Sequence, residues 1–154
     1  GHNGQTEAAV DLAKAYQFGV GTPENVDKSE QYWHEALTLN STEAYLGYAG
    51  FLLDKKAKQP TDGAVKDLIW KAADLDDPRA LSAAFQIAVS TDDRAQQSRW
   101  IDKLRQQSQQ GDITSSLELA DAYLAQGSEH FSPAAALGLY KAAATNGNAY
   151  AQAK

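Results

Sequence analysis

The sequence contains no cysteine and no methionine, and it has only four prolines among 154 residues. The lack of thiols excludes disulfides, thiolate zinc sites and cysteine nucleophiles. No apolar run approaches 18 residues, so we expect no membrane-spanning segment. No stretch alternates apolar and polar residues for long enough to predict a β-strand. Helices are the remaining regular structure.

Basic residues are also scarce: the chain has 14 lysines and arginines and 20 acidic residues, so its net charge is −6. This balance repels a phosphate backbone, so nucleic acid is not an expected partner. Hydrophobic residues make up 43% of the chain and charged residues 22%, which is typical of a folded protein.

An internal repeat organises the chain. The clearest copy runs from Gly111 to Gly147, and equivalent starts are spaced 35 or 36 residues apart. They fall at Gly4, Asn40, Asp76, Gly111 and Gly147. In four of the five copies, the next residue is a good helix N-cap, whose side-chain oxygen can accept from free backbone N–H groups. These residues are Ser41, Asp77, Asp112 and Asn148, with Gln5 as the exception.

The first helix of each repeat carries a recurring stripe. Four residues after the start lies a small side chain, and positions eight, nine and twelve share one helical face. The stripe is Ala8, Leu12, Ala13 and Tyr16 in the first repeat and Ser115, Leu119, Ala120 and Tyr123 in the fourth. The third repeat departs from it, because Phe85 stands where the others have alanine.

A second helix closes each repeat with a bulky residue one turn before a small one, as in Trp33 and Ala36. The expected starts of these helices are Asn25 or Asp27, Thr61 or Asp62, Asp92, and Ser132 as N-cap with Pro133 in the first turn. In the third repeat, Ser90–Asp93 leaves almost no loop between the two helices.

These patterns predict an all-α fold: a right-handed α-solenoid of four helical hairpins with the start of a fifth. The chain is expected to form one solenoid fragment. Its repeats span residues 4–39, 40–75, 76–110 and 111–146, and residues 147–154 begin a further unit. Residues 1–3 have the character of a tag remnant, so we expect a piece of a longer protein. A hairpin cannot bury its apolar stripe alone, and stacking the next hairpin covers it.

The spacing of Ala8, Leu12, Ala13 and Tyr16, followed by the Gly19-Val20-Gly21 loop, resembles the Sel1-like repeat, a relative of the tetratricopeptide repeat. The likeness covers nearly the whole chain and is weaker in the second and third repeats, which lack the loop glycines. It implies a non-enzymatic adaptor for assembling other proteins, in the bacterial periplasm or secreted. It also suggests the Sel1-like lipoprotein scaffold of exopolysaccharide (alginate) export. A cytoplasmic location stays open.

No residue pattern predicts a catalytic, cofactor or metal site. His34 and His130 lie in different repeats, and a zinc site needs ligands that converge. Pairs such as Asp76-Asp77 sit at expected helix starts, where capping explains them. Gly19-Val20-Gly21 follows a helix and lacks the later lysine of a phosphate-binding loop.

We expect a protein or peptide partner in the groove lined by the first helices. Positions seven, ten and fourteen of each repeat lie off the core face, and a cluster of aromatic residues stands among small ones in the second repeat. Local packing is the alternative for that cluster. The candidate residues are Asp11, Lys14, Phe18, Tyr45, Tyr48, Phe51, Gln86, Glu118 and Asp121. Acidic positions in the fourth repeat favour a partner with basic character. Carbohydrate binding and a purely structural spacer are the alternative functions.

Overall fold

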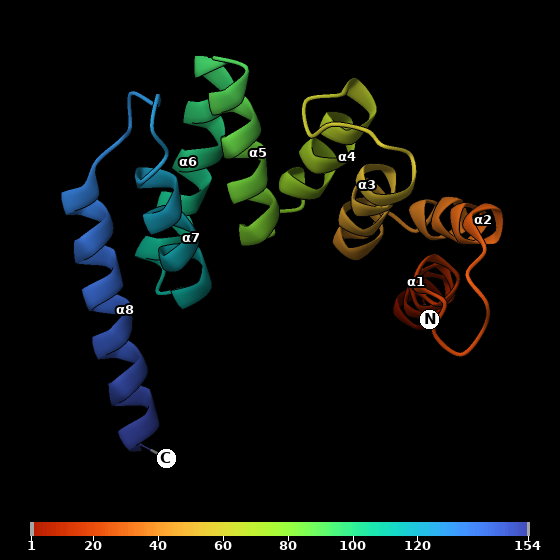
Figure 1. The fold of residues 1–154 in the computed structure, drawn as a ribbon. Helices are drawn as coiled ribbons and strands as arrows, with labels where there is room; N and C mark the ends of the chain where they lie inside the picture. Colours follow the sequence, from red (N-terminus) through yellow and green to blue (C-terminus); the bar gives the residue numbers. More distant parts are fainter. Residues whose placement is uncertain (1, 154) are drawn as a thin grey trace. The chain divides into compact units, whose positions relative to one another are not determined.

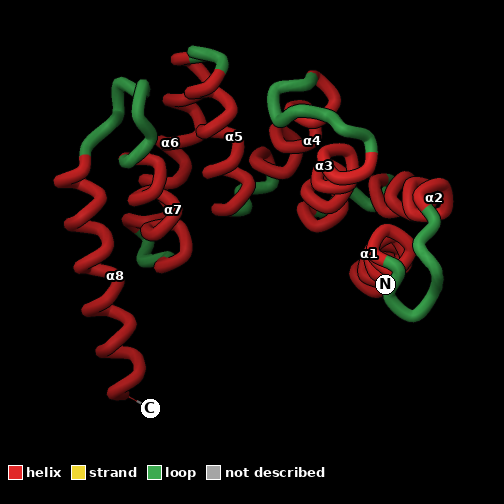
Figure 2. Tube along the Cα trace, in the orientation of Figure 1, coloured by secondary structure: helices red, strands yellow, loops and turns green. Residues whose placement is uncertain are grey.

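The computed structural model describes residues 2–153, and the side chains of residues 4–146. All regular secondary structure in this range is α-helical, which confirms the predicted all-α class (Figures 1 and 2). The helices are α1 (His2–Phe18), α2 (Val26–Leu37), α3 (Thr42–Lys55), α4 (Gly63–Asp74), α5 (Pro78–Ser90), α6 (Arg94–Gln109), α7 (Ile113–Tyr123) and α8 (Pro133–Ala153).

Consecutive helices pair as predicted, since the closest packing joins α1 to α2, α3 to α4, α5 to α6 and α7 to α8. The chain divides into two compact units, Gly1–Leu75 and Asp76–Lys154, called here the N-terminal and C-terminal units. Each unit contains two hairpins. The division falls at the predicted boundary between the second and third repeats.

The helix starts follow the predicted caps. Asn25 caps α2, Ser41 caps α3, and Asp77 caps α5 with Pro78 at its first position. Ser132 Oγ accepts from the Ala135 N–H at the start of α8, as expected. The side chain of Asp62 does not cap α4, because its carboxylate accepts the N–H of Gln59 in the preceding loop at 2.9 Å.

Four connections share a two-residue joint: one residue in the left-handed conformation, followed directly by an N-cap. The left-handed residue breaks the helix, and the cap satisfies free N–H groups of the next. Three joints lie at the repeat boundaries predicted from the sequence, and the fourth connects α5 to α6. They are Asn40-Ser41 (φ 51° at Asn40), Asp76-Asp77 (φ 67° at Asp76), Asp92-Asp93 (φ 53° at Asp92) and Gly111-Asp112 (φ 95° at Gly111).

The predicted core stripe is buried at many positions, but Ala8 and Leu12 on α1 are exposed. Ala13 is 0% exposed, as are Ala44 and Ala120, whereas Leu12 is 42% exposed. Its equivalent Leu119 is only 4% exposed, because α7 packs against α5 and α6 as well as α8. Helix α1 packs on α2 and α3 in its unit, so the prediction that Leu12 belongs to the core is wrong.

The second helix of the fourth repeat was expected to end at Gly147, and this prediction is also wrong, because α8 continues to Ala153. A glycine permits a left-handed turn without requiring one. The alanines around it favour helix propagation over a stop.

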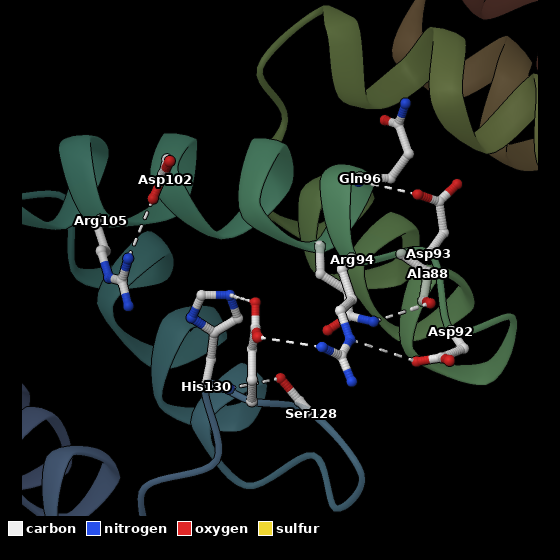
Figure 3. A network of polar contacts seen from close by, with 11 residues as sticks. Ala88, Asp92, Asp93, Arg94, Gln96, Asp102, Arg105, Ser128 and His130 are labelled. Carbon is white, nitrogen blue, oxygen red and sulfur yellow. Dashed lines mark hydrogen bonds and ion pairs between the residues drawn. The ribbon is translucent and has the colours of Figure 1, made fainter.

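Polar contacts hold the loops at one end of the C-terminal unit (Figure 3). Ser128 Oγ accepts the N–H of His130 at 3.0 Å, and Arg94 lies 3.9 Å from Asp92. The buried Gln97 donates to the carbonyl of Ala88 at 3.2 Å. This last bond ties the start of α6 to the end of α5.

Candidate peptide-binding groove

A groove with a volume of about 270 Å³ lies in the N-terminal unit between α1 and α3. Helix α1 supplies one wall, α3 supplies the other, and one residue of α2 forms the floor. Five of the eight lining residues occupy positions seven, ten or fourteen of their predicted repeat, which the sequence pattern placed off the core face. The lining residues are Lys14, Gln17, Phe18, Trp33, Leu46, Gly47, Gly50 and Asp54.

Phe18 is the most exposed aromatic side chain of the groove, at 60% of its surface. It is the last residue of α1, and Gly19 follows with φ 68°, so the chain turns away immediately after it. No core contact therefore covers the ring. An exposed aromatic ring at the edge of an apolar groove is typical of protein-binding surfaces.

Trp33 forms the floor and is almost completely buried, at 1% exposure. Its ring lies directly against Gly47 on α3: a Cβ atom added there would stand 2.3 Å from Cη2 of the indole. Glycine is therefore required at position 47 by close approach. At Gly50, one turn later, an added Cβ would meet no atom within 4 Å, so this part of the wall is open.

A hydrogen-bond chain links the floor to the edge of the groove. The indole Nε1–H of Trp33 donates to Gln17 Oε1 at 3.1 Å, and Gln17 Nε2 donates to Asp54 Oδ2 at 3.2 Å. Gln17 is only 3% exposed, so both ends of its amide are satisfied inside the protein. Asp54 is 46% exposed, and these two hydrogen bonds hold its carboxylate in place beside the groove.

Gln17 and Trp33 are groove residues that the repeat pattern did not predict. Trp33 is a buried residue that also forms the floor of the groove. Gln17 lies one turn after Ala13 and two turns after Val10, both of which are buried. A glutamine within an apolar helical stripe was the available signal, since a buried amide needs specific partners.

The aromatic cluster of the second repeat is mainly packing. Tyr45 is 8% exposed and its hydroxyl donates to Asn40 Oδ1, while Phe51 is 0% exposed. The expectation that these two residues contact a partner is therefore corrected, because α3 buries them among its neighbours. Tyr48 is half-buried and donates to Glu30 at 2.9 Å. Burial, together with this bond, raises the pKa of Tyr48 to about 12.

The remaining candidates are at the surface but do not line the groove described above. Asp11 is exposed on α1. Gln86 and Asp121 are exposed in the C-terminal unit, and Glu118 is half-buried there. Asp121 accepts a hydrogen bond from the Tyr140 hydroxyl, and this bond raises the pKa of Tyr140. These acidic groups therefore face α8 in part.

Within residues 4–146, no group of three or more histidine, aspartate or glutamate side chains is placed to hold a metal ion. His34 lies 3.5 Å from the Tyr48 hydroxyl, and His130 packs against Phe85. Over the same described part of the chain, the helices are too short or too polar to span a bilayer.

Comparison with models of protein families and with curated proteins finds no match for this chain. What the molecule does must therefore be inferred from its repeat pattern and from the geometry of its surfaces. The groove between α1 and α3 is the feature on which such an inference can be built.

Proposed function

We propose that this chain is a non-catalytic protein-interaction scaffold whose hairpins are Sel1-like repeats of a right-handed α-solenoid. In this proposal, an apolar side chain of a partner protein inserts into the groove between α1 and α3. The observation that carries it is the combination of the exposed Phe18 with the open wall at Gly50.

The chemistry of the groove favours a peptide segment. Phe18 and Leu46 offer apolar surface above the floor at Trp33. Gly50 leaves room for a side chain to approach the backbone of α3, whereas the Trp33 ring fills the space at Gly47. A cavity of about 270 Å³ accommodates one or two side chains rather than a whole cofactor. Burial of an aromatic or aliphatic anchor would contribute about 1.5–3 kcal/mol.

The alternative of carbohydrate binding relied on the cluster Tyr45, Tyr48 and Phe51. Sugars stack on exposed rings, and two of these three rings are buried. A spacer role requires no groove at all, so the open, apolar pocket at Phe18 favours binding over it.

The cellular setting follows from the Sel1-like resemblance alone. It supports a bacterial periplasmic or secreted location and a place in an exopolysaccharide-export assembly. Fractionation of the source cells with an antibody against the chain tests the location. Recovery in the cytoplasmic fraction would contradict it.

Peptide phage display on the immobilised chain tests the binding function. We expect selected peptides to share an apolar anchor and to lose binding at least tenfold to Phe18→Ala and to Gly50→Leu, which fills the groove. Gly138→Leu is the matched control, because Gly138 is also an exposed helical glycine with no atom near its Cβ position. Peptides that bind all three variants equally would place the binding surface elsewhere.

A further inference from the structure

We propose that the groove takes, beside the apolar anchor of the partner, an arginine side chain of the same partner, with the Asp54 carboxylate as its anionic acceptor and the Phe18 ring as its stacking surface. This inference rests on the proposed function and specifies the chemistry of its ligand. It stands on three observations: the position of Asp54, the buried amide that holds it, and the exposed ring beside it.

Asp54 and Phe18 both line the groove, and Asp54 accepts a hydrogen bond from Gln17, the residue before Phe18. Asp54 is 46% exposed and Phe18 60% exposed. A flat guanidinium can stack on an aromatic ring and donate two N–H groups to a carboxylate. Lysine lacks this planar geometry.

The buried amide of Gln17 orients Asp54 before any ligand arrives. Gln17 donates to Asp54 Oδ2, and Trp33 fixes Gln17 from the opposite side. A carboxylate held in this way loses less side-chain entropy on binding than a free one. Oδ1 has no hydrogen bond to any described residue, so it is available to a ligand.

The surrounding charges are compatible with a cationic ligand. Lys55 lies 3.7 Å from Asp54, but its shorter contact, at 2.8 Å, is with Glu24. Lys14 also lines the groove, one helical turn before Phe18, and its positive charge opposes the guanidinium that Asp54 attracts. The chain as a whole carries a net charge of −6, which attracts basic segments over longer distances.

The test compares two peptides that differ only in charge: acetyl-Ser-Leu-Arg-Leu-Ser-amide and the same peptide with citrulline in place of arginine. Binding to the full 154-residue chain is followed by ¹⁵N NMR at the amides of Gly47 and Gly50 and at the indole N–H of Trp33. We expect the arginine peptide to bind about tenfold more tightly than the citrulline peptide, because a charged guanidinium forms stronger hydrogen bonds to a carboxylate than the neutral citrulline side chain does.

Asp54→Asn removes the charge and leaves an amide oxygen that can still accept from Gln17. We expect this variant to weaken the arginine peptide about tenfold and to leave the citrulline peptide unchanged. Asp67→Asn is the matched control, because Asp67 is an exposed carboxylate on α4 of the same unit. It makes the same change in net charge and should preserve the arginine preference.

Equal affinities of the two peptides would overturn the arginine inference while leaving the groove as a peptide site. The inference would also fail if Asp54→Asn had no larger effect than Asp67→Asn, since general negative charge would then explain the preference. If neither peptide shifted the Gly47, Gly50 and Trp33 signals, the groove itself would be rejected, and the proposed function with it.

Discussion

Gly47 and Gly50 are one helical turn apart on α3, yet their surroundings are opposite. We expect Gly47→Ala to lower the free energy of unfolding by about 1–3 kcal/mol, because its Cβ would collide with Trp33. Gly50→Ala should raise it by up to about 1 kcal/mol, since alanine favours the helix and meets no neighbour. Urea unfolding of both variants checks the pair. Equal effects would mean that Trp33 repacks without cost.

Tyr48 makes stability depend on pH in the alkaline range. Its pKa is raised from the ordinary value of 10.0 to about 12 by burial and by the bond to Glu30, so folding favours the protonated hydroxyl. This contribution is fully present below pH 10 and is lost as the pH rises through about 12.

We therefore expect the urea midpoint to fall between about pH 10 and about pH 12, and Tyr48→Phe to reduce that fall. Tyr32→Phe is a suitable control, because the described residues provide no hydrogen bond to the Tyr32 hydroxyl. A Tyr48→Phe variant with the original pH dependence would assign the effect to another group.

Sequence reasoning at this scale succeeded where a position depends on periodicity. Lys14, Phe18, Gly47, Gly50 and Asp54 were placed off the core face, and all five line the groove. The sequence-based predictions failed where the direction of a side chain depends on its rotamer. Helical spacing could not show which of three neighbouring rings on α3 would turn inward. The amide bridge through Gln17 depends equally on side-chain geometry.

At the scale of the helix, termini were the most predictable feature, because a cap is a local interaction between residues close in sequence. Asn25, Ser41, Asp77 and Ser132 show this. The extent of α8 was less predictable. A helix end depends on what the following residues can pack against, and the sequence pattern does not report it.

The end of α3 carries a strained residue. Ala57 has φ 55°, a left-handed conformation that costs a non-glycine residue roughly 1–2 kcal/mol. We expect Ala57→Gly to stabilise the N-terminal unit by about 1 kcal/mol in thermal or urea unfolding. Ala64→Gly, inside α4, should instead reduce stability by up to about 1 kcal/mol. A loss of stability in Ala57→Gly would show that backbone entropy outweighs the strain.

At the scale of the whole molecule, the two compact units suggest that stability is distributed locally. Helices α7 and α8 pack with each other, and α7 also packs with α5 and α6, all in the C-terminal unit. In repeat proteins, a perturbation is felt mainly by neighbouring elements.

Native-state hydrogen exchange of Gly47→Ala tests this expectation. Amide exchange should accelerate in α1–α3 and remain unchanged in α7, because opening occurs in separate cooperative segments. Acceleration by the same factor throughout the chain would show that the molecule opens as one unit.

The joints built from a left-handed residue and an N-cap have a consequence for how such a chain can be altered. The same connection, a left-handed residue followed by an N-cap, occurs at Asn40-Ser41, Asp76-Asp77, Asp92-Asp93 and Gly111-Asp112. If the coding sequence before one joint were fused to the coding sequence after another, the fused chain would need no new linker between its helices. Helices between joints can thus be duplicated or deleted as cassettes, and Asp92-Asp93 extends that freedom to the interior of a hairpin.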